Sequence, residues 1–577
     1  MHQEGAGEAP AGGGGARSNP AEGPTRVAAD RMTQALQTAR RADAPSRFAA
    51  VRDLIARRDL RAAAVESTAL CRDHPGFAAG WHVAAYLALQ SGDAPGACEL
   101  VARALALEPA NAPFRLLHGQ CLAAAGRPDE ARTVADGLTD GLDDAAFWLA
   151  LGTLRQQLNA HEAARAAYDR ALVRQPDHAA ALFNRATVRR FLGDLAGAEA
   201  DYDRVLALRP DDDEAYLNRS ELRPQDPARN HVAELEAALA RCGDSGGAGE
   251  VRLSYALVKE YEDLGEYRRS FAALARGAGA RRRTLAYDVA RDVATVDWII
   301  EAFSGLPPLP DPMTDAQADR TADASDNASP VFVLGLPRSG TTLVDRILSS
   351  HPQLVSAGES NAFAAAVVAA AGEGSAAGAT DRRALIARSA TVDFGALGRD
   401  YLGRVAREGY RARFVDKMPP NYLYCGLIAR ALPGATLVHV ERHPMAVCYA
   451  MYKTLFRDGY PFSYSLTDLA AYYVAYARLM DFWRQALPGR IHTVAYERLV
   501  ADQRGETARL LAACALPWDE ACIDFHKNPT ATTTASASQV RRPLYSTSLW
   551  QWRHYEDELA GLRHALEAAG IAVGVPP

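Results

Sequence analysis

Lysine is nearly absent from this chain of 577 residues, which has 64 lysines and arginines together but only four lysines. Acidic residues number 70, so the formal net charge at pH 7 is −6. Bulk electrostatic binding to nucleic acid or to an anionic membrane needs a basic field, which this charge balance excludes. Any site for an anion must therefore be local.

Paired cysteines and long apolar runs are also missing. The eight cysteines are scattered without a CxxC pair or a zinc-ligand spacing, which predicts free thiols in a reducing compartment and no metal site. The longest apolar run, residues 362–371, is too short to span a bilayer. Residues 1–30 lack the basic start and apolar core of a signal peptide and are expected to form a disordered tail. We therefore expect a cytoplasmic protein without a membrane partner.

A period of 34 residues dominates the chain before residue 225. Prolines and turn residues recur at this spacing, or within one residue of it or its double: Pro75, Pro109, Pro176 and Pro210, and Gly92, Gly126, Asn159 and Gly193. An alanine follows five positions after each turn, where two helices would approach closely: Ala97, Ala131, Ala164 and Ala198. The pattern resembles the tetratricopeptide repeat, whose helical pairs stack because no single pair buries its own apolar face.

The tetratricopeptide resemblance implies a helical solenoid within residues 31–305, with a displaced helical pair near residues 254–278. Two roles stay open for it. Either the helices only support the domain that follows, or their concave groove binds a protein or peptide, as an acceptor or a partner. A homodimer is left open as well. Proline, aspartate and alanine break the periodicity over residues 306–330, which predicts a linker before a second domain at 331–577.

A candidate anion loop follows the linker, in the segment PVFVLGLPRSGTTLVDRILSSHP. An apolar run, a glycine-bearing turn and an amphipathic stretch indicate strand, loop and helix. Backbone N–H groups in such a loop, with the positive end of the helix dipole, bind phosphate or sulfate. The loop residues expected to take part are Arg338, Ser339, Gly340, Thr341 and Thr342. Thr341 stands where a Walker A motif requires lysine, which disfavours a nucleoside triphosphatase.

As a whole, PRSGTTL resembles the 5′-phosphosulfate loop of sulfotransferases, particularly the tyrosylprotein sulfotransferases and the bacterial proteins that join tetratricopeptide repeats to such a domain. The fold class expected is therefore α + α/β: a tetratricopeptide solenoid, then a P-loop-like parallel-sheet sulfotransferase domain. Apolar runs predict its strands near residues 331–336, 412–416, 435–441 and 490–496. The resemblance implies transfer of a sulfuryl group from 3′-phosphoadenosine 5′-phosphosulfate (PAPS), without a metal, to an acceptor hydroxyl on a protein or peptide, with tyrosine as one candidate.

The resemblance also implies catalytic residues. Glu359, in SAGES, stands where the related enzymes keep their catalytic glutamate and is expected to be the general base. Lys417 resembles the lysine that steadies the bridging oxygen and the sulfate, and Arg338 is expected to pair with the transferring group. Ser536 opens a segment that resembles the part closing over PAPS, where the serine approaches the sulfate.

The remaining nucleotide contacts are implied in the same way. Thr341 and Thr342 would hold the 5′-phosphate, and Arg442, after an apolar strand, would contact the 3′-phosphate. Tyr496 looks like an adenine or phosphate contact, or equally like a core tyrosine.

This chain departs from the family pattern at two positions. A frequent serine is Ala450 here, and a downstream lysine is Gln551. Lys453, and either Arg541 or Arg542, are the cations expected to compensate. The departures keep alive a second hypothesis, an adaptor whose repeats bind partners and whose second domain binds nucleotide without turnover. A P-loop kinase is a third, disfavoured by Thr341.

Overall fold

The computed structural model describes residues 43–139, 144–243, 246–309, 329–372, 381–410, 413–456, 459–528, 540 and 542–574. The chain divides into two compact units, one ending at Pro210 and the other beginning at Asp211. No helix in these described ranges combines the length and apolar character needed to cross a bilayer.

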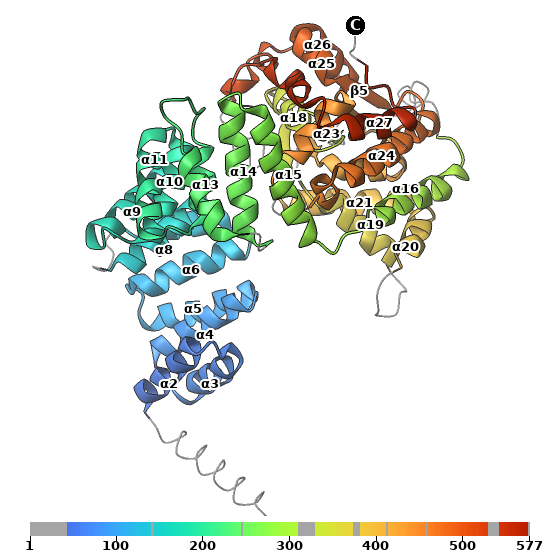
Figure 1. Cartoon of the computed structure of the whole chain (residues 1–577). Helices are drawn as coiled ribbons and strands as arrows, with labels where there is room; N and C mark the ends of the chain where they lie inside the picture. The colour runs from blue at the N-terminus through green and yellow to red at the C-terminus, as the bar shows by residue number, and fades with distance from the viewer. Residues whose placement is uncertain are drawn as a thin grey trace, which may run out of the picture. The chain divides into compact units, whose positions relative to one another are not determined.

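The first unit consists of helical pairs (Figure 1). The described helices are α2 (Ala44–Ala56), α3 (Leu60–Asp73), α4 (Ala78–Gln90), α5 (Ala94–Leu107), α6 (Ala112–Ala124), α7 (Pro128–Asp136), α8 (Ala145–Gln157), α9 (His161–Arg174), α10 (Ala179–Leu192) and α11 (Leu195–Leu208). The predicted turn residues all have positive φ: Gly92 +87°, Gly126 +74°, Asn159 +58° and Gly193 +85°. Glycine and asparagine recur there because they enter the left-handed region most readily.

The recurring alanines lie where the helices of a pair meet. Ala97, Ala131, Ala164 and Ala198 are all fully buried, with 0% of their surface exposed. A larger side chain at these positions would push the two helices apart, since protein interiors are closely packed. The sequence prediction of close helix approach is confirmed.

The second unit starts with helices that precede the sheet: α12 (Asp213–Ser220), α13 (Val232–Cys242), α14 (Ala248–Asp263), α15 (Tyr267–Arg283) and α16 (Val289–Ser304). The displaced helical pair predicted near residues 254–278 is α14 and α15, which pack against each other (Figure 1). These helices belong to the same compact unit as the sheet. The domain limits given by the sequence stay predictions.

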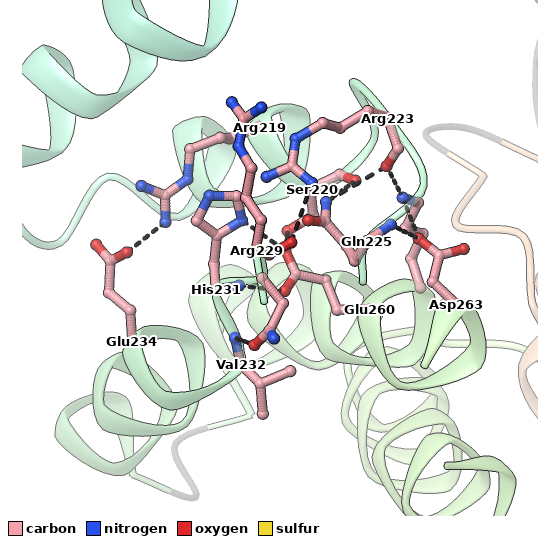
Figure 2. A network of polar contacts seen from close by, with 12 residues as sticks. Arg219, Ser220, Arg223, Gln225, Arg229, His231, Val232, Glu234, Glu260 and Asp263 are labelled. Atoms are coloured by element: carbon pink, nitrogen blue, oxygen red, sulfur yellow. Dashed lines mark hydrogen bonds and ion pairs between the residues drawn. The ribbon is translucent and has the colours of Figure 1, made fainter. Parts of the chain in front are cut away.

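A buried carboxylate on α14 holds the loop between α12 and α13 (Figure 2). Glu260 is fully buried and accepts hydrogen bonds from the backbone N–H of His231 at 2.6 Å and from Ser220 Oγ at 2.9 Å. The His231 ring lies 2.9 Å from the same carboxylate, and Asp263 accepts from the backbone N–H of Gln225 at 2.7 Å. Burial alone would raise the pKa of Glu260, but the hydrogen bonds from His231 and Ser220 outweigh it and lower that pKa.

The core of the second unit is a parallel sheet of five strands in the order β2-β3-β1-β4-β5. The strands are β1 (Val331–Leu334), β2 (Val355–Gly358), β3 (Phe414–Lys417), β4 (Thr436–Glu441) and β5 (Ile491–Ala495). All described pairings are parallel, and β4 with β5 has the longest register, from Leu437 opposite Ile491 to Glu441 opposite Ala495. The four predicted strands are present. The edge strand β2 was missed because it is short and only partly buried.

Helices pack on both faces of this sheet. Val331 and Val333 of β1 pack with Val344 and Ile347 of α18 (Thr341–Ser349), whereas Phe332 contacts the rings of Phe363 and Tyr401 on the opposite face. The two rings come from α19 (Ala362–Gly372) and α21 (Phe394–Arg407). A strand buried on both faces appears in the sequence as a continuous apolar run, which is why β1 could be predicted.

The other elements of this unit follow the strands. They are α20 (Arg382–Ser389), α22 (Cys425–Ala431), α23 (Pro444–Tyr452), α24 (Leu466–Ala486), α25 (Tyr496–Ala501), α26 (Gln503–Ala513), α27 (Ala560–Ala568) and a 3₁₀ helix, η7 (Gln551–Tyr555). The predicted fold class, α followed by α/β, is confirmed.

Candidate functional site

Every strand of the sheet ends at a residue or loop that the sequence singled out. The glycine-bearing loop follows β1, Glu359 follows β2, Lys417 is the last residue of β3, Arg442 follows β4 and Tyr496 follows β5. Because parallel strands end at one edge of a sheet, these side chains gather there. The connections from β1 and β4 lead to opposite halves of the sheet, which opens a crevice between the two strand ends.

Two glycines give the loop after β1 its shape. Gly335 has φ +147°, and a Cβ there would lie 2.6 Å from the carbonyl oxygen of Val440 in the neighbouring strand. Gly340 has φ +111°, and its Cβ would lie 2.6 Å from the ring of Tyr496. Arg338, between them, also has a positive φ, +67°. The loop is therefore folded tightly against β4 and α25 and accepts only glycine at these two close approaches.

The start of α18 is open to an anion. Gly340 is its N-cap residue and provides no side chain to bind the first N–H groups of the helix. Thr341 and Thr342, in the first turn, line the adjoining cavity. Ser339 Oγ is buried and has no hydrogen-bond partner within the described ranges. A helix N-terminus without a side-chain cap, at the positive end of the helix dipole, favours a phosphate or sulfate group.

Two guanidinium groups lie beside this loop. Arg442 donates to the carbonyl oxygen of Arg338 at 2.9 Å and to that of Ser548 at 2.6 Å, and it lies over the ring of Tyr496, 4.8 Å from the centroid. Burial lowers the pKa of Arg338, and the nearby positive charge of Arg442 lowers it further. Bringing two partly buried cations together is unfavourable unless negative charge lies close to them, so the pair favours an anion-binding site.

Glu359 and Lys417 form an ion pair. The Lys417 side chain is 1% exposed and donates to Glu359 Oε1, whereas 43% of the Glu359 side chain is exposed. Within the described ranges no hydrogen bond is made by Glu359 Oε2. The carboxylate is therefore held on one side by the lysine and can accept a proton on the other.

A second lysine is held at the far end of α23. Lys453 Nζ donates to Glu262 Oε2 at 2.6 Å and to Gln551 Oε1 at 3.0 Å. Gln551, where the resemblance implied a lysine, thus binds the lysine at position 453. Tyr496 is buried against Gly340, and its hydroxyl lies 3.2 Å from Ser548 Oγ.

One cavity of about 1120 Å³ connects these groups. Its lining includes nine of the predicted residues: Arg338, Gly340, Thr341, Thr342, Glu359, Arg442, Lys453, Tyr496 and Arg542. Lys417 does not line this cavity itself but donates a hydrogen bond to Glu359, which does. Ser339 lines a separate cavity of about 580 Å³. Ser536 and Arg541 lie outside the described residues. The larger cavity exceeds the ~300–1,000 Å³ usual for small-molecule sites, so it has room for a nucleotide and part of a second substrate.

Sequence reasoning missed two lining residues, Glu262 and Tyr267, which come from the α14–α15 pair. Both lie in the helical pair predicted near residues 254–278, but nothing in its sequence indicates a contact with the sheet, from whose strands it is far along the chain. It also missed Asp416, the neighbour of Lys417 on β3. Burial raises the pKa of Asp416 to about 7, although Tyr401 and Asn421 donate to its carboxylate at 2.8 and 3.2 Å. Among the described residues no cluster of three or more His, Cys, Asp or Glu is placed to hold a metal ion.

Family models match both parts of the chain. The sulfotransferase family matches residues 330–520, and the tetratricopeptide repeat matches residues 88–154 and 149–213. The chain therefore contains tetratricopeptide repeats followed by a sulfotransferase-family domain. This confirms the resemblance seen in the sequence.

Individual relatives match part of the chain. An uncharacterized protein of Aquifex aeolicus (strain VF5) is 31% identical over 247 residues, which are 41% of this chain and 32% of that protein. A Caenorhabditis briggsae protein named "Putative protein-tyrosine sulfotransferase" is 27% identical over 231 residues, 38% of this chain and 80% of that one. The chain thus spans about a third of the length of the Aquifex relative.

Among solved structures, the sulfotransferase domain of the Synechococcus PCC 7002 olefin synthase is 21% identical. The match covers 40% of this chain and 90% of that domain, with a TM-score of 0.29.

Proposed function

We propose that this protein is a sulfotransferase that moves a sulfuryl group from PAPS to an acceptor hydroxyl. The observation that carries the proposal is the cavity at the strand ends, where Arg338 and Arg442 flank an uncapped helix start. These groups fit a donor with two anionic ends. Arg338, Thr341 and Thr342 would hold its phosphosulfate end, and Arg442 its ribose phosphate, because a guanidinium fork suits a terminal phosphate.

The reaction follows from the positions of the charges. The acceptor oxygen attacks sulfur in line, and a new S–O bond forms as the bond between sulfur and the bridging phosphate oxygen breaks. The acceptor proton passes to Glu359, and the bridging oxygen keeps the electron pair as part of the leaving phosphate. Arg338 and Lys417 would neutralise the charge that grows there. Positioning and electrostatic stabilisation then supply most of the rate.

Glu359→Gln tests the base. The substitution keeps the size of the side chain and removes its capacity to accept a proton, so transfer of labelled sulfate should fall by about 10²- to 10⁴-fold. Binding of adenosine 3′,5′-bisphosphate, measured by calorimetry, should be retained. Glu520→Gln is the matched control, because Glu520 is an exposed carboxylate paired with Arg504 and should leave turnover unchanged. Unchanged turnover in Glu359→Gln would reject the assignment.

We propose a protein or peptide hydroxyl, and first of all tyrosine, as the acceptor. Support comes from the name of the Caenorhabditis relative and from aromatic residues in the same cavity wall as Glu359, among them Phe456 and Tyr460. The repeats are proposed to bind this acceptor or another protein partner. Labelled PAPS supplied with tyrosine and serine forms of one acidic peptide should label the tyrosine form. Labelling of carbohydrate or lipid alone would contradict the acceptor class.

The adaptor hypothesis predicts a different result with the same reagents. The bisphosphate would bind, but no acceptor in a fractionated lysate would gain label from PAPS.

We propose that the protein is cytoplasmic because all eight cysteines are unpaired and six of them are buried, as expected in a reducing compartment.

A further inference from the structure

Glu262 lies at the donor site although it precedes the matched sulfotransferase segment, residues 330–520, by some seventy positions in the chain. It is near the end of α14 and lines the large cavity. One carboxylate oxygen accepts from Tyr449 at 2.8 Å and from Tyr555 at 3.2 Å, and the other accepts from Lys453 at 2.6 Å. A single carboxylate thus ties together α23, η7 and the lysine at the end of α23.

The helix that carries Glu262 is fixed from two sides. Glu260 and Glu262 are two positions apart, so at 3.6 residues per turn they point to nearly opposite sides of α14. Glu260 faces the buried network of Figure 2, and Glu262 faces the cavity. A side chain on a helix fixed in this way has little freedom to move, which suits it to hold another group in place.

The α14–α15 pair is also docked directly on the site elements. Tyr255 donates to the backbone carbonyl of Tyr452 at 3.2 Å, inside the core. Tyr267 stacks on His554 of η7 with 3.9 Å between ring centroids and 7° between planes. These contacts hold Glu262 near the C-terminal end of α23, where Lys453 is the C-cap residue.

Lys453 has one donor left for a ligand. An ammonium group carries three N–H donors, and Glu262 and Gln551 take two of them. The described residues provide no hydrogen bond for the third, and Lys453 lines the cavity. Lys453 and Arg442 stand at the two ends of α23, so both are positioned by the same helix and face the same cavity.

We propose that Glu262 is a positioning residue that holds Lys453 as a second cation for the ribose phosphate of the donor. This rests on the proposed function, since it assumes a 3′-phosphorylated nucleotide in the cavity. The phosphosulfate end already has the loop, the start of α18 and Arg338. The cations at the ends of α23 are then available for the other anionic group. A lysine fixed by Glu262 and Gln551 loses less side-chain entropy on binding than a free one.

Binding of two nucleotides to the full chain tests this inference. Adenosine 3′,5′-bisphosphate and adenosine 5′-phosphate differ only in the phosphate that Lys453 is proposed to bind. Glu262→Gln should weaken the bisphosphate about tenfold, the loss expected for one charge-assisted contact, and leave the monophosphate unchanged. Lys453→Met should give the same selective loss, and the double variant should be no weaker than Lys453→Met alone. Glu266→Gln is the matched control, because Glu266 is the N-cap residue of α15, just after α14, and pairs with Arg269.

Two results would overturn the inference. Unchanged or tighter bisphosphate binding in Glu262→Gln would show that Glu262 does not position the lysine or that it repels the phosphate. Equal weakening of both nucleotides would show a merely structural role. If the unsubstituted protein bound no bisphosphate at all, the proposed function itself would fail, which is a separate outcome.

Discussion

At the scale of single residues, the site depends on side-chain contacts between distant parts of the chain, which the sequence does not reveal. The motif PRSGTTL located the loop, but not that Arg442 donates to the backbone of Arg338 and so joins two segments about a hundred positions apart. The sequence places Lys453 near Ala450 without indicating its partners, and the structure shows them to be Glu262 and Gln551. Long-range contacts of this kind have no local sequence signal.

Arg442→Lys should weaken adenosine 3′,5′-bisphosphate binding by at least about tenfold. Lysine keeps the charge but cannot donate to the carbonyl oxygens of Arg338 and Ser548 and also present a fork to phosphate. Titration calorimetry measures the change. Arg504→Lys, at an exposed pair with Glu520, is the control and should bind as the unsubstituted protein does. Equal affinities for the two variants would contradict the role of Arg442.

Gly340→Ala should destabilise the second unit more than Gly409→Ala. Both glycines have a positive φ, +111° and +100°, so alanine costs about 1–2 kcal/mol at either position from backbone strain. At Gly340 the new Cβ would also meet the Tyr496 ring at 2.6 Å, whereas nothing lies within 4 Å at Gly409. Urea unfolding compares the two free energies of unfolding. Equal losses would contradict the close packing of the loop on Tyr496.

At the scale of elements, β3 places a buried acid next to the catalytic candidate Lys417. The pKa of Asp416 is raised to about 7 in the fold, from an ordinary 3.8, mainly by burial. The folded chain therefore holds this proton more tightly than the unfolded chain. The contribution of Asp416 to stability is present below about pH 4 and is lost as the pH rises to about 7.

Asp416→Asn should remove this pH dependence. The free energy of unfolding of the unsubstituted protein should fall by more than about 1 kcal/mol between pH 5 and pH 8 relative to that of the variant. Urea unfolding at the two pH values gives the difference. Asp393→Asn is the control, because Asp393 is an exposed carboxylate that caps α21, and asparagine caps a helix as well. Parallel pH profiles for Asp416→Asn and the unsubstituted protein would contradict the prediction.

The packing of the α14 helix on the loop between α12 and α13 depends on the hydrogen bonds that Glu260 accepts. Glu260→Gln should lower the free energy of unfolding by about 1–3 kcal/mol. The two carboxylate oxygens accept separately from the His231 N–H and from Ser220, whereas an amide has only one acceptor oxygen. The lowered pKa of Glu260 means that this stabilisation is present above the ordinary value of 4.5 and is lost as the pH falls below it. Urea unfolding at pH 7 should show the loss, and the difference between the variant and the unsubstituted protein should narrow as the pH falls below 4.5. No difference at pH 7 would contradict it.

Most of the helical pairs and strands could be predicted from the sequence. The 34-residue period and its glycines located the helical pairs, and apolar runs located four strands, because fully buried strands are continuously apolar. The strand β2 was not predicted, because it is an edge strand of only four residues and is partly exposed. The site residues at the ends of β1, β3, β4 and β5 were found because their motifs resemble those of sulfotransferases. Glu262 and Asp416 were not found, because their importance comes from burial and distant partners.

At the scale of the whole molecule, the large cavity extends beyond the matched sulfotransferase segment on both sides. The segment covers residues 330–520, whereas the cavity also takes Glu262 and Tyr267 from before it and Val540 and residues between Arg542 and His554 from after it. The second compact unit, rather than the matched segment, is therefore the complete structural frame of the site.

Titration of the full chain with adenosine 3′,5′-bisphosphate, followed by calorimetry, tests the central claim most directly. One site per chain with micromolar or tighter affinity is predicted, weakened by Arg338→Ala as well as by Arg442→Lys. Absence of any heat of binding from correctly folded protein would contradict the assignment of the cavity to a sulfo-nucleotide.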